Sequence, residues 1–544
     1  MQADRVLPLH EQPDVHARRW LLLGTMCLSL VLVVMSVSSL NVAAPRLQQE
    51  LGTTATQLHW IIDSYALVFA GLLLSAGAIG DRFGRKGALL GGLGVFAVGL
   101  VVAGLGDTAG QVIAGRAIMG VGSAFVMPAT LSIITAVFPP EERGRAIAIW
   151  AGFAGAGAAI GPVVAGALLE SFWWGSAVLI NLPVVAIAGV AVARLAPRSR
   201  DSHVTPLDVV GSVLALFGMV ALLYGIIESA ERGWTDGLVL GAFAAAAALI
   251  AGFVVWEGRT DHPMLPLDLF RDRRFSVASG VITLTFFSMF GFFFLSTLYL
   301  QYVLGYSPLE AGLAGLPMAA AMIVVAPRSA ALTDRFGGAP VMAGGFVLMA
   351  SALGLFTQVT TGTPYLGVAP GFVLLGAGLA ATAAPATGML MSAVPIDKAG
   401  VGSAVNDTTR EFGGALGIAV LGTLVGSAYR SSFEAESSGV PADAAESAGE
   451  SIGAAWSIAP DLPGGQAMLV QAQEAFVDAF RLTNGVALAV AVAAGALVWA
   501  TRRSTGGGTE SVVPAPVEID LRLGDAAVVE PAVDPVVEPA FKAG

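Results

Sequence analysis

Fourteen stretches of this sequence are apolar over enough residues to cross a lipid bilayer as helices. A helix that spans the hydrocarbon core needs roughly 20 predominantly apolar residues. The stretches begin near Trp20, Leu58, Gly87, Gln111, Arg145, Trp174, Leu207, Gly237, Phe275, Leu309, Pro340, Leu366, Val401 and Leu482. The sequence therefore predicts an all-α membrane protein with fourteen transmembrane helices.

Composition supports a membrane location and disfavours several functions. Only 12% of the residues are charged, whereas soluble domains carry about 25%. The single cysteine, Cys27, cannot form a disulfide within the chain, and the five scattered histidines make no Cys/His metal cluster, so no metal or cofactor is expected. Much of the net charge of -11 lies in two polar segments, which disfavours a nucleic-acid partner. No nucleophile–base constellation suggests an enzyme.

The positively charged residues predict the orientation of the chain, because Lys and Arg gather in the cytoplasmic loops of membrane proteins. With both termini in the cytoplasm, most of the 28 Lys and Arg residues lie on that side. The exceptions outside are Arg46, Arg232, Arg430 and Arg481. The first apolar helix follows two arginines and is long enough to remain as an uncleaved span. A multi-pass protein of the inner or plasma membrane is expected.

These predictions divide the chain into five parts. They are a cytoplasmic N-terminal tail (1–19), a six-helix bundle (20–200), two inserted helices (201–260), a second six-helix bundle (270–503) and a disordered cytoplasmic tail (504–544). Residues 429–480, within the second bundle, are predicted to form an acidic extracellular loop whose Ala-rich stretches suit short helices.

Two features occur twice and indicate an internal duplication. The segment Gly77–Lys86 follows an apolar stretch, and a degraded copy, Thr333–Gly338, follows a later one. The fourth span contains Pro128-Ala-Thr and the twelfth contains Pro385-Ala-Thr, at nearly the same separation along the chain. Two six-helix halves in parallel repeat are therefore predicted, with a substrate site between them near mid-membrane.

Four motifs, each in the expected span, resemble those of the major facilitator superfamily, in its fourteen-helix drug:proton antiporter branch of the EmrB/QacA type. They are Asn41–Pro45, Gly77–Lys86, Arg116–Gly122 and Gly157–Gly166. The resemblance covers about residues 20 to 430. It implies the major facilitator fold, transport by alternating access, and a place for Asn41 at the substrate cavity.

The turn between the second and third spans combines glycines with charges: Gly77, Asp81, Arg82, Gly84, Arg85 and Lys86. Glycine permits a tight reversal, and an aspartate here can pair with the cations or face a helix N-terminus. By resemblance the turn is a conformational latch that breaks for inward opening, and the alternative is a simple positively charged anchor. The copy keeps Asp334 and Arg335 but lacks the Arg-Lys pair, so the latch is expected to be strong in the first half only.

Charged residues inside predicted spans are the candidates for proton coupling and substrate binding: Asp63, Arg116, Asp407 and Glu411. A charge within a span is costly and normally faces a cavity or a partner. Asp407 and Glu411 are four residues apart and share a helix face, where they could carry protons or attract a cation. The alternatives are that Arg116 snorkels to the outer surface, that Arg410 neutralises either acid of the Asp407–Glu411 pair, and that Asp63 is a surface residue.

One position departs from the family pattern. Members usually carry an aspartate in the first span, five residues before the motif asparagine, where this chain has Ser36. Serine cannot carry a proton at physiological pH. Either Asp63, Asp407 and Glu411 suffice for coupling, or the stoichiometry or the mechanism differs.

Two further spans carry unusual residue patterns. In the fifth span, glycines recur every four or five residues from Gly152, which predicts one face cleared for close helix contact. By resemblance the motif residues Gly157, Gly161, Pro162 and Gly166 hint at export, and generic small-residue packing is the alternative. The ninth span carries six phenylalanines between Phe286 and Phe294, of which one or two could line a hydrophobic cavity.

The leading hypothesis is a proton-driven exporter of amphipathic, hydrophobic or cationic small molecules, as in multidrug or antibiotic efflux. Its expected partners are the substrate, protons and the lipid bilayer, and the chain can work as a monomer. A dedicated exporter of one endogenous metabolite or lipid, with non-standard coupling, is the first alternative. A non-transporting membrane sensor or scaffold is the second.

Overall fold

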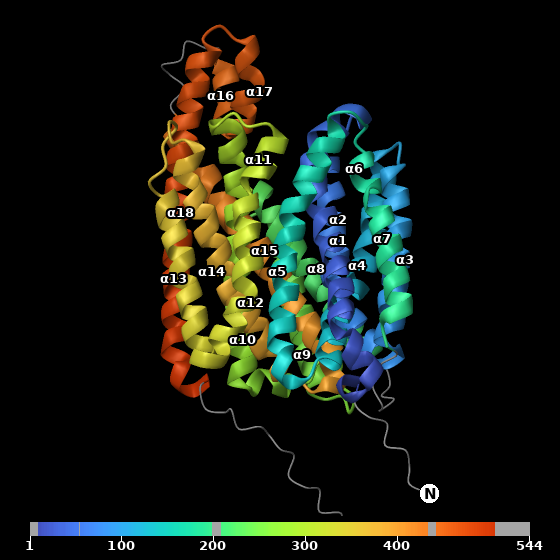
Figure 1. The fold of residues 1–544 in the computed structure, drawn as a ribbon. Coiled ribbons are helices and arrows are strands. Elements are labelled where there is room, and N and C mark those ends of the chain that lie inside the picture. Colours follow the sequence, from blue (N-terminus) through green and yellow to red (C-terminus); the bar gives the residue numbers. More distant parts are fainter. Residues whose placement is uncertain (1–8, 54, 198–207, 434–441, 506–544) are drawn as a thin grey trace, which may run out of the picture. The chain divides into compact units, whose positions relative to one another are not determined.

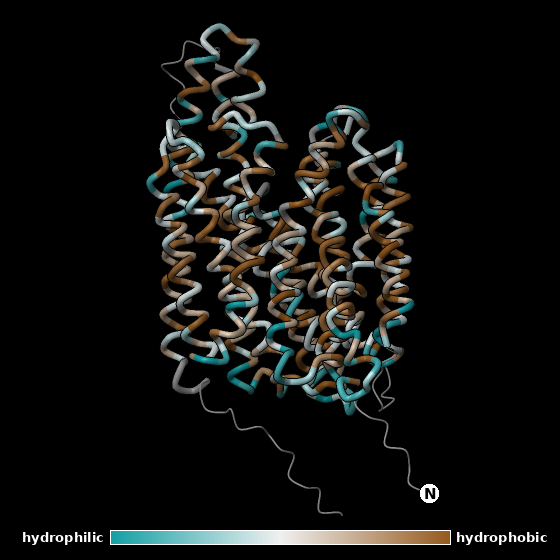
Figure 2. Tube along the Cα trace, viewed as in Figure 1, coloured by the Kyte–Doolittle hydropathy of each residue, from teal (hydrophilic) through white to brown (hydrophobic). Residues whose placement is uncertain are grey.

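The computed structural model describes residues 9–53, 55–197, 208–433 and 442–505, and every regular element in these ranges is a helix (Figure 1). Fourteen helical segments are long and apolar enough to cross a membrane. Hydrophilic residues gather at the two ends of the helices, and apolar residues predominate between them (Figure 2). The prediction of an all-α protein with fourteen spans is confirmed.

The first half of the chain contributes six spans. They are α1 (Pro13–Leu51), α2 (Ala55–Phe83), α3 (Arg85–Gly104), α4 (Ala109–Val137), α5 (Pro140–Leu169) and the pair α6 (Ser176–Leu179) and α7 (Asn181–Leu195), preceded by the 3-10 turn η1 (Leu9–Glu11). Helix α4 packs on α2 and α3, and α1 packs on α5. The apolar part of α4 is 78% buried, so this helix lies inside the protein.

The second half repeats this arrangement. Its spans are α10 (Arg273–Leu298) with the π-helical turn η3 (Tyr299–Val303), α11 (Pro308–Ala314) with α12 (Leu316–Phe336), α13 (Gly338–Phe356), α14 (Tyr365–Ser392), α15 (Ala399–Ser432) and α18 (Gly465–Thr505). The 3-10 turns are η2 (Leu267–Arg271), η4 (Ile396–Lys398) and η6 (Ala459–Asp461). Helix α14 packs on α12 and α13, and α10 packs on α15.

Two helices, α8 (Val209–Arg232) and α9 (Gly237–Glu257), stand between the halves in the sequence. Helix α8 packs on α2 of the first half and on α15 of the second, where Leu223 and Ile226 join a cluster with Leu67, Ala70 and Ala419. Helix α9 packs mainly on α8, and its apolar part is only 17% buried. Most of α9 therefore faces the lipid.

The described part of the segment before the last span is largely helical. Helices α16 (Ala442–Glu450) and α17 (Ile452–Ile458) form there, and the Tyr429 hydroxyl donates to the Ala448 carbonyl over 2.9 Å. The predicted start of the last span, near Leu482, is wrong, because α18 already begins at Gly465. The ring of Phe480 stacks on Tyr299, and such buried aromatic packing stabilises the extra turns.

The two halves meet through the same contact made twice. Helix α2 packs on α15, and α12, which has the place of α2 in the second half, packs on α5, which has the place of α15 in the first. Helix α4 also contacts α15. The duplicated sequence has therefore folded into two related bundles whose second and fifth spans form the interface.

Glycines let neighbouring helices approach closely. A Cβ atom on Gly92 of α3 would lie 2.8 Å from the Gly122 carbonyl oxygen of α4, whereas one on the adjacent Gly91 would meet nothing within 4 Å. Since lipid tails are as apolar as the side chains, helices in a membrane associate largely through such close packing.

This difference gives a matched test of the packing. We expect Gly92→Ala to destabilise the protein by about 1–3 kcal/mol, the usual cost of overpacking. Gly91→Ala should be neutral or stabilising by up to about 1 kcal/mol, because alanine has the higher helix propensity. Thermal unfolding of the purified variants in detergent measures both effects. Equal melting temperatures would contradict the α3–α4 contact.

Candidate functional site

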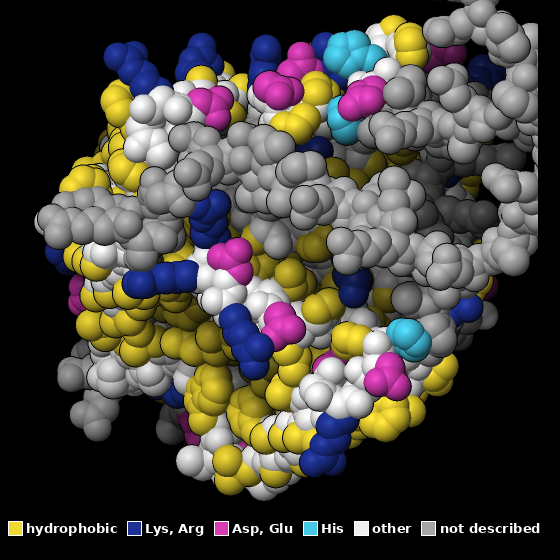
Figure 3. Space-filling model, turned by 90° about the horizontal axis from the view of Figure 1, so that it is seen from below, with side chains coloured by type: hydrophobic (Ala, Val, Ile, Leu, Met, Phe, Trp, Pro, Cys, Tyr) yellow, Lys and Arg dark blue, Asp and Glu magenta, His cyan; other side chains and the backbone are white. Residues whose placement is uncertain are grey.

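The first contact of interest lies at the end of the protein where α2 meets α3 and α14 meets α15. We call this end of the protein the basic end, because Lys and Arg side chains are spread over its face (Figure 3). The Asp81 carboxylate is 5% exposed there and accepts hydrogen bonds from the Gly400 and Val401 amides at 2.8 and 3.2 Å. Both amides lie in the first turn of α15, so Asp81 of the first half holds a helix N-terminus of the second.

Arg85 completes this contact. Its Nε donates to Asp81 Oδ1 over 2.9 Å, and its Nη2 donates to the Ile396 carbonyl over 2.6 Å. Gly84, with a φ of 112°, supplies the left-handed backbone of the turn. A Cβ atom on Gly400 would lie 2.7 Å from the Asp81 carboxylate, so only glycine permits this approach. The sequence prediction named no role for Gly400.

The other charges of the turn do different work. Lys86 donates to the Ala193 carbonyl of α7 over 2.7 Å, and Arg82 lies over the ring of Phe83. Asp334 and Arg335, in the degraded copy, are both exposed at the end of α12. The structure therefore forms the inter-half contact at the first turn only, and its role as a conformational latch stays a prediction.

The second group of site residues lies between α2 and α4. Arg116 is 2% exposed, donates to the Ile61 carbonyl over 3.1 Å, and places its guanidinium 4.5 Å from the centre of the Tyr65 ring. The Tyr65 hydroxyl in turn donates to Ser123 over 2.8 Å. Asp63, which is half-buried, interacts electrostatically with Arg116. The alternative that Arg116 snorkels to the surface is therefore wrong.

The third group lies on α15, close to the interface between the halves. Asp407 is 1% exposed and accepts a hydrogen bond from the Asn406 amide over 3.0 Å. The nearest Arg410 nitrogen is 4.0 Å from its Oδ1, and Asp407 Oδ2 has no hydrogen-bond partner in the described part of the chain. The two charges therefore form only a loose ion pair.

Arg410 is held by aromatic rings as much as by Asp407. Its guanidinium lies 4.9 Å from the centre of the Trp150 ring on α5 and 5.0 Å from that of Phe286 on α10. A desolvated cation–π contact contributes about 2 kcal/mol or more. Phe286 thus packs on Arg410, a cation of the protein itself. Trp150 contacts the same cation from the first half. From the sequence, Arg410 was expected only to neutralise an acid, and no role was predicted for Trp150.

The threonines of the repeated Pro-Ala-Thr are the sequence feature that could have predicted the neighbours of Arg410. Thr130 accepts a hydrogen bond from the Trp150 indole over 3.3 Å, and Thr387 donates to Asn406 over 2.9 Å. Trp150 and Asn406 occupy equivalent places in the two halves, as do the two threonines of the repeated Pro-Ala-Thr. Thr387 also accepts from Arg410 over 3.4 Å. The repeat thus builds one polar cluster from both halves.

Glu411 differs from the other acids of the site. Its side chain is half-buried, and within the described residues it makes no hydrogen bond or ion pair. It lies within electrostatic reach of Arg410 on its own helix and of Tyr65 on α2. Tyr65 thus interacts with both Arg116 and Glu411 and links the second group of residues with the third.

The glycines of α5 do not clear one face, as the sequence predicted, but two. Cβ atoms on Gly157 and Gly161 would meet α1, whereas those on Gly152 and Gly166 would meet Ala326 of α12 and Leu309. Spacings of five residues turn the helix by about 140° from one glycine to the next, which places them on different faces. Helix α5 is therefore packed closely against both halves at once.

Ser36 on α1, where the family usually has an aspartate, makes only a local contact. Ser36 is 4% exposed, and its hydroxyl donates to the Val33 carbonyl of its own helix over 2.8 Å. It is thus satisfied locally. The side chain of Asn41 lies outside the described residues.

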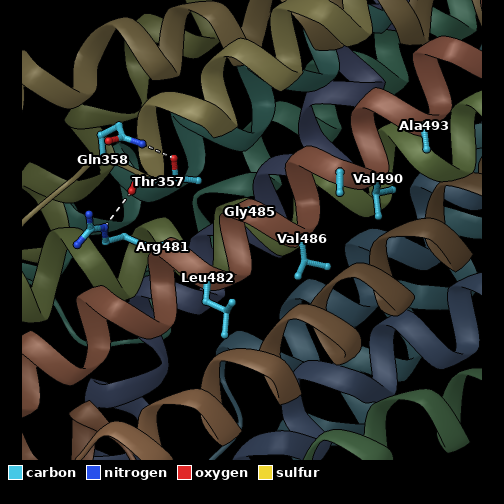
Figure 4. A pocket seen from close by; sticks show the side chains of 9 residues that line it. Thr357, Gln358, Arg481, Leu482, Gly485, Val486, Val490 and Ala493 are labelled. Carbon is cyan, nitrogen blue, oxygen red and sulfur yellow. Dashed lines mark hydrogen bonds between the residues drawn. The ribbon is translucent and has the colours of Figure 1, made fainter.

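A groove of about 760 Å³ lies along α18 beside the end of α13. Figure 4 shows Thr357 and Gln358 at one end, with Arg481 donating to the Thr357 carbonyl, and small or apolar side chains of α18 along the rest. None of the predicted site residues lines it. This open groove is therefore distinct from the buried charges, which carry the candidate site.

Fourteen spans, two duplicated bundles and charged residues buried near their interface define a membrane transporter. The major facilitator superfamily model matches residues 26–418, and the chain belongs to that family.

Relatives and solved structures agree with this assignment. The chain is 34% identical to the multidrug efflux pump LfrA of Mycolicibacterium smegmatis (88% of this chain, 96% of the relative) and 34% identical to the tetracenomycin C resistance and export protein of Streptomyces glaucescens (90% and 93%). It is also 34% identical to the methyl viologen resistance protein SmvA of Salmonella typhimurium (85% and 93%). The fold matches the human organic anion transporter MFSD10 with a TM-score of 0.56 at 16% identity, over 88% of this chain and 100% of the other.

The contact at the basic end gives a second matched test. Asp81→Asn leaves the buried Arg85 cation without its counter-charge, and breaking a buried ion pair costs about 3–5 kcal/mol. Asp334→Asn, at the equivalent exposed position, should change stability by less than about 0.5 kcal/mol. Thermal unfolding compares the two, and hydrogen exchange of residues 396–405 should rise in Asp81→Asn alone. Similar behaviour of the two variants would contradict the asymmetry.

Proposed function

We propose that this protein is a secondary active exporter of hydrophobic or cationic small molecules, driven by protons and working by alternating access. The observation that carries the proposal is the pair of acids on α15 near the interface between the halves, the buried Asp407 and the half-buried Glu411, next to the cation Arg410. Membrane-embedded acids of this kind bind protons or cations in transporters. The names of the relatives, which are efflux and resistance proteins, support export as the direction of transport.

In the proposed orientation the basic end lies in the cytoplasm, as the excess of Lys and Arg there favours. The Asp81 contact then closes the cytoplasmic side in the described conformation. Breaking it would let the halves separate there and admit a substrate from the cytoplasm or the inner leaflet. The matching contacts of α2 with α15 and of α5 with α12 supply the two surfaces about which the halves rock.

Exchange of substrate for a proton is assigned to Glu411 and Asp407. Glu411 makes no hydrogen bond or ion pair among the described residues, so its carboxyl group is available to a proton or to a cationic substrate. Protonation from outside would release the substrate, and loss of the proton to the cytoplasm would prepare the site for the next molecule. Ser36 cannot contribute to this cycle.

The acids are tested by the double substitution Asp407→Asn and Glu411→Gln. We expect efflux of a fluorescent organic cation from vesicles to lose its dependence on the pH gradient, because neither replacement can exchange a proton. The exposed acids Glu474 and Asp478 provide the matched control, Glu474→Gln with Asp478→Asn, which should export normally. Unchanged proton-dependent efflux in the first variant would contradict the assignment.

A dedicated exporter of one compound is the second candidate, and the names of relatives such as the tetracenomycin C resistance and export protein favour it. A panel of structurally unrelated antibiotics and dyes, tested on cells with and without the protein, separates the two. Protection against several classes of compound is expected for a multidrug exporter. Protection against one class only would favour the dedicated exporter.

A further inference from the structure

The position of Arg410 carries an inference beyond its use as a counter-charge. Four groups contact its guanidinium: Asp407 on the same helix, Trp150 on α5 of the first half, Phe286 on α10 and the Thr387 hydroxyl on α14. In this conformation the rings hold it, because the distance to Asp407 is 4.0 Å and both Asp407 Oδ2 and Arg410 Nε lack hydrogen bonds within the described part.

The charge on Asp407 decides between these partners. Two opposite charges attract strongly in a low-dielectric interior, so an ionised Asp407 draws the guanidinium along α15 into a closer pair. A proton taken from the aqueous side onto Asp407 removes that attraction. The aromatic faces are then the best remaining partners for the cation.

We propose that Arg410 is a positioning residue that reports the charge on Asp407 to the interface between the halves, through its contact with Trp150. The inference rests on the proposed function, since it concerns the acids assigned to proton exchange. Trp150 belongs to the first half and is itself fixed by Thr130, so its contact with Arg410 ties α15 to α5.

The same helix carries the contact at the basic end. The first turn of α15 binds Asp81, and Arg410 lies about 15 Å further along this continuous helix. Loss of the Trp150 contact frees α15 to move and therefore weakens its hold on Asp81. A protonated Asp407 thus favours a closed basic end, and an ionised Asp407 favours its opening.

Asp81 of α2 is a further acid that binds α15, at its first turn, and the variant Asp407→Asn separates its titration from that of Asp407. The charges that act on Asp407 and Arg410 are each other and Glu411, all on α15. Trp150 of α5, Phe286 of α10 and Thr387 of α14 contact Arg410, and none of them titrates between pH 5 and 9.

Hydrogen exchange of residues 394–405, measured in lipid nanodiscs between pH 5 and 9, tests the proposal. In the unmodified protein, exchange should accelerate with pH beyond the intrinsic chemical rate, because Asp407 loses its proton. In Asp407→Asn, that extra acceleration should vanish and the segment should stay protected. Trp150→Leu and Arg410→Lys should raise exchange about tenfold at low pH, the effect of losing about 1.4 kcal/mol. Lysine keeps the charge but lacks the flat guanidinium that stacks on a ring.

The control is Phe292→Leu, which removes a ring that is 1% exposed and packs on Phe356 and Phe372 in the second half. It should leave exchange of residues 394–405 unchanged, and exchange of α3 serves as a reference for correct folding in every variant. Unmodified exchange in Trp150→Leu or Arg410→Lys would overturn the proposal, as would a persistent pH response in Asp407→Asn. Because the measurement uses no substrate and no gradient, its outcome is independent of whether the protein exports with protons.

Discussion

Charge buried inside an apolar bundle is the constraint on which the rest of this structure depends. A guanidinium or a carboxylate cannot remain in such a medium without a partner, and each buried pair therefore dictates which helices lie together. Arg116 contacts the Ile61 carbonyl and the Tyr65 ring. Asp81 binds Arg85 and the first turn of α15, and Arg410 contacts rings from two helices. Two of these groupings reach across the interface between the halves.

Close packing makes those contacts possible. Gly400 permits the Asp81 carboxylate to reach the α15 amides, and Gly77 lets α2 approach the same turn, where a Cβ atom would lie 2.6 Å from the Gly400 carbonyl oxygen. The glycines of α5 do the same on two faces, toward α1 and toward the second half. In a membrane such contacts replace the hydrophobic driving force that a soluble core would use. Glycine therefore determines where charges can meet.

Duplication supplies a common framework, and divergence gives the two halves different tasks. The equivalent turns both contain a glycine with positive φ, Gly84 and Gly337, yet only the first is followed by the Arg85 that pairs with a buried aspartate. Likewise, the two equivalent threonines bind a tryptophan in one half and an asparagine in the other. The first turn therefore joins the two halves at the basic end, whereas Asp334 and Arg335 of the second turn are exposed.

The sequence by itself determined the class of the fold, because apolar length is a property of each segment alone. It also determined the repeat and the positions of the charged residues within the spans, including the asymmetry of the Asp81 and Asp334 turns. The early start of α18 and the two faces of α5 escaped prediction, since aromatic packing and helix rotation decide them. Only the tertiary structure showed that Arg410 lies between Trp150 and Phe286, because those residues come from three helices far apart in the chain. A charged residue in an apolar span shows from the sequence alone that a partner is needed. Which residue becomes that partner depends on which helices pack together.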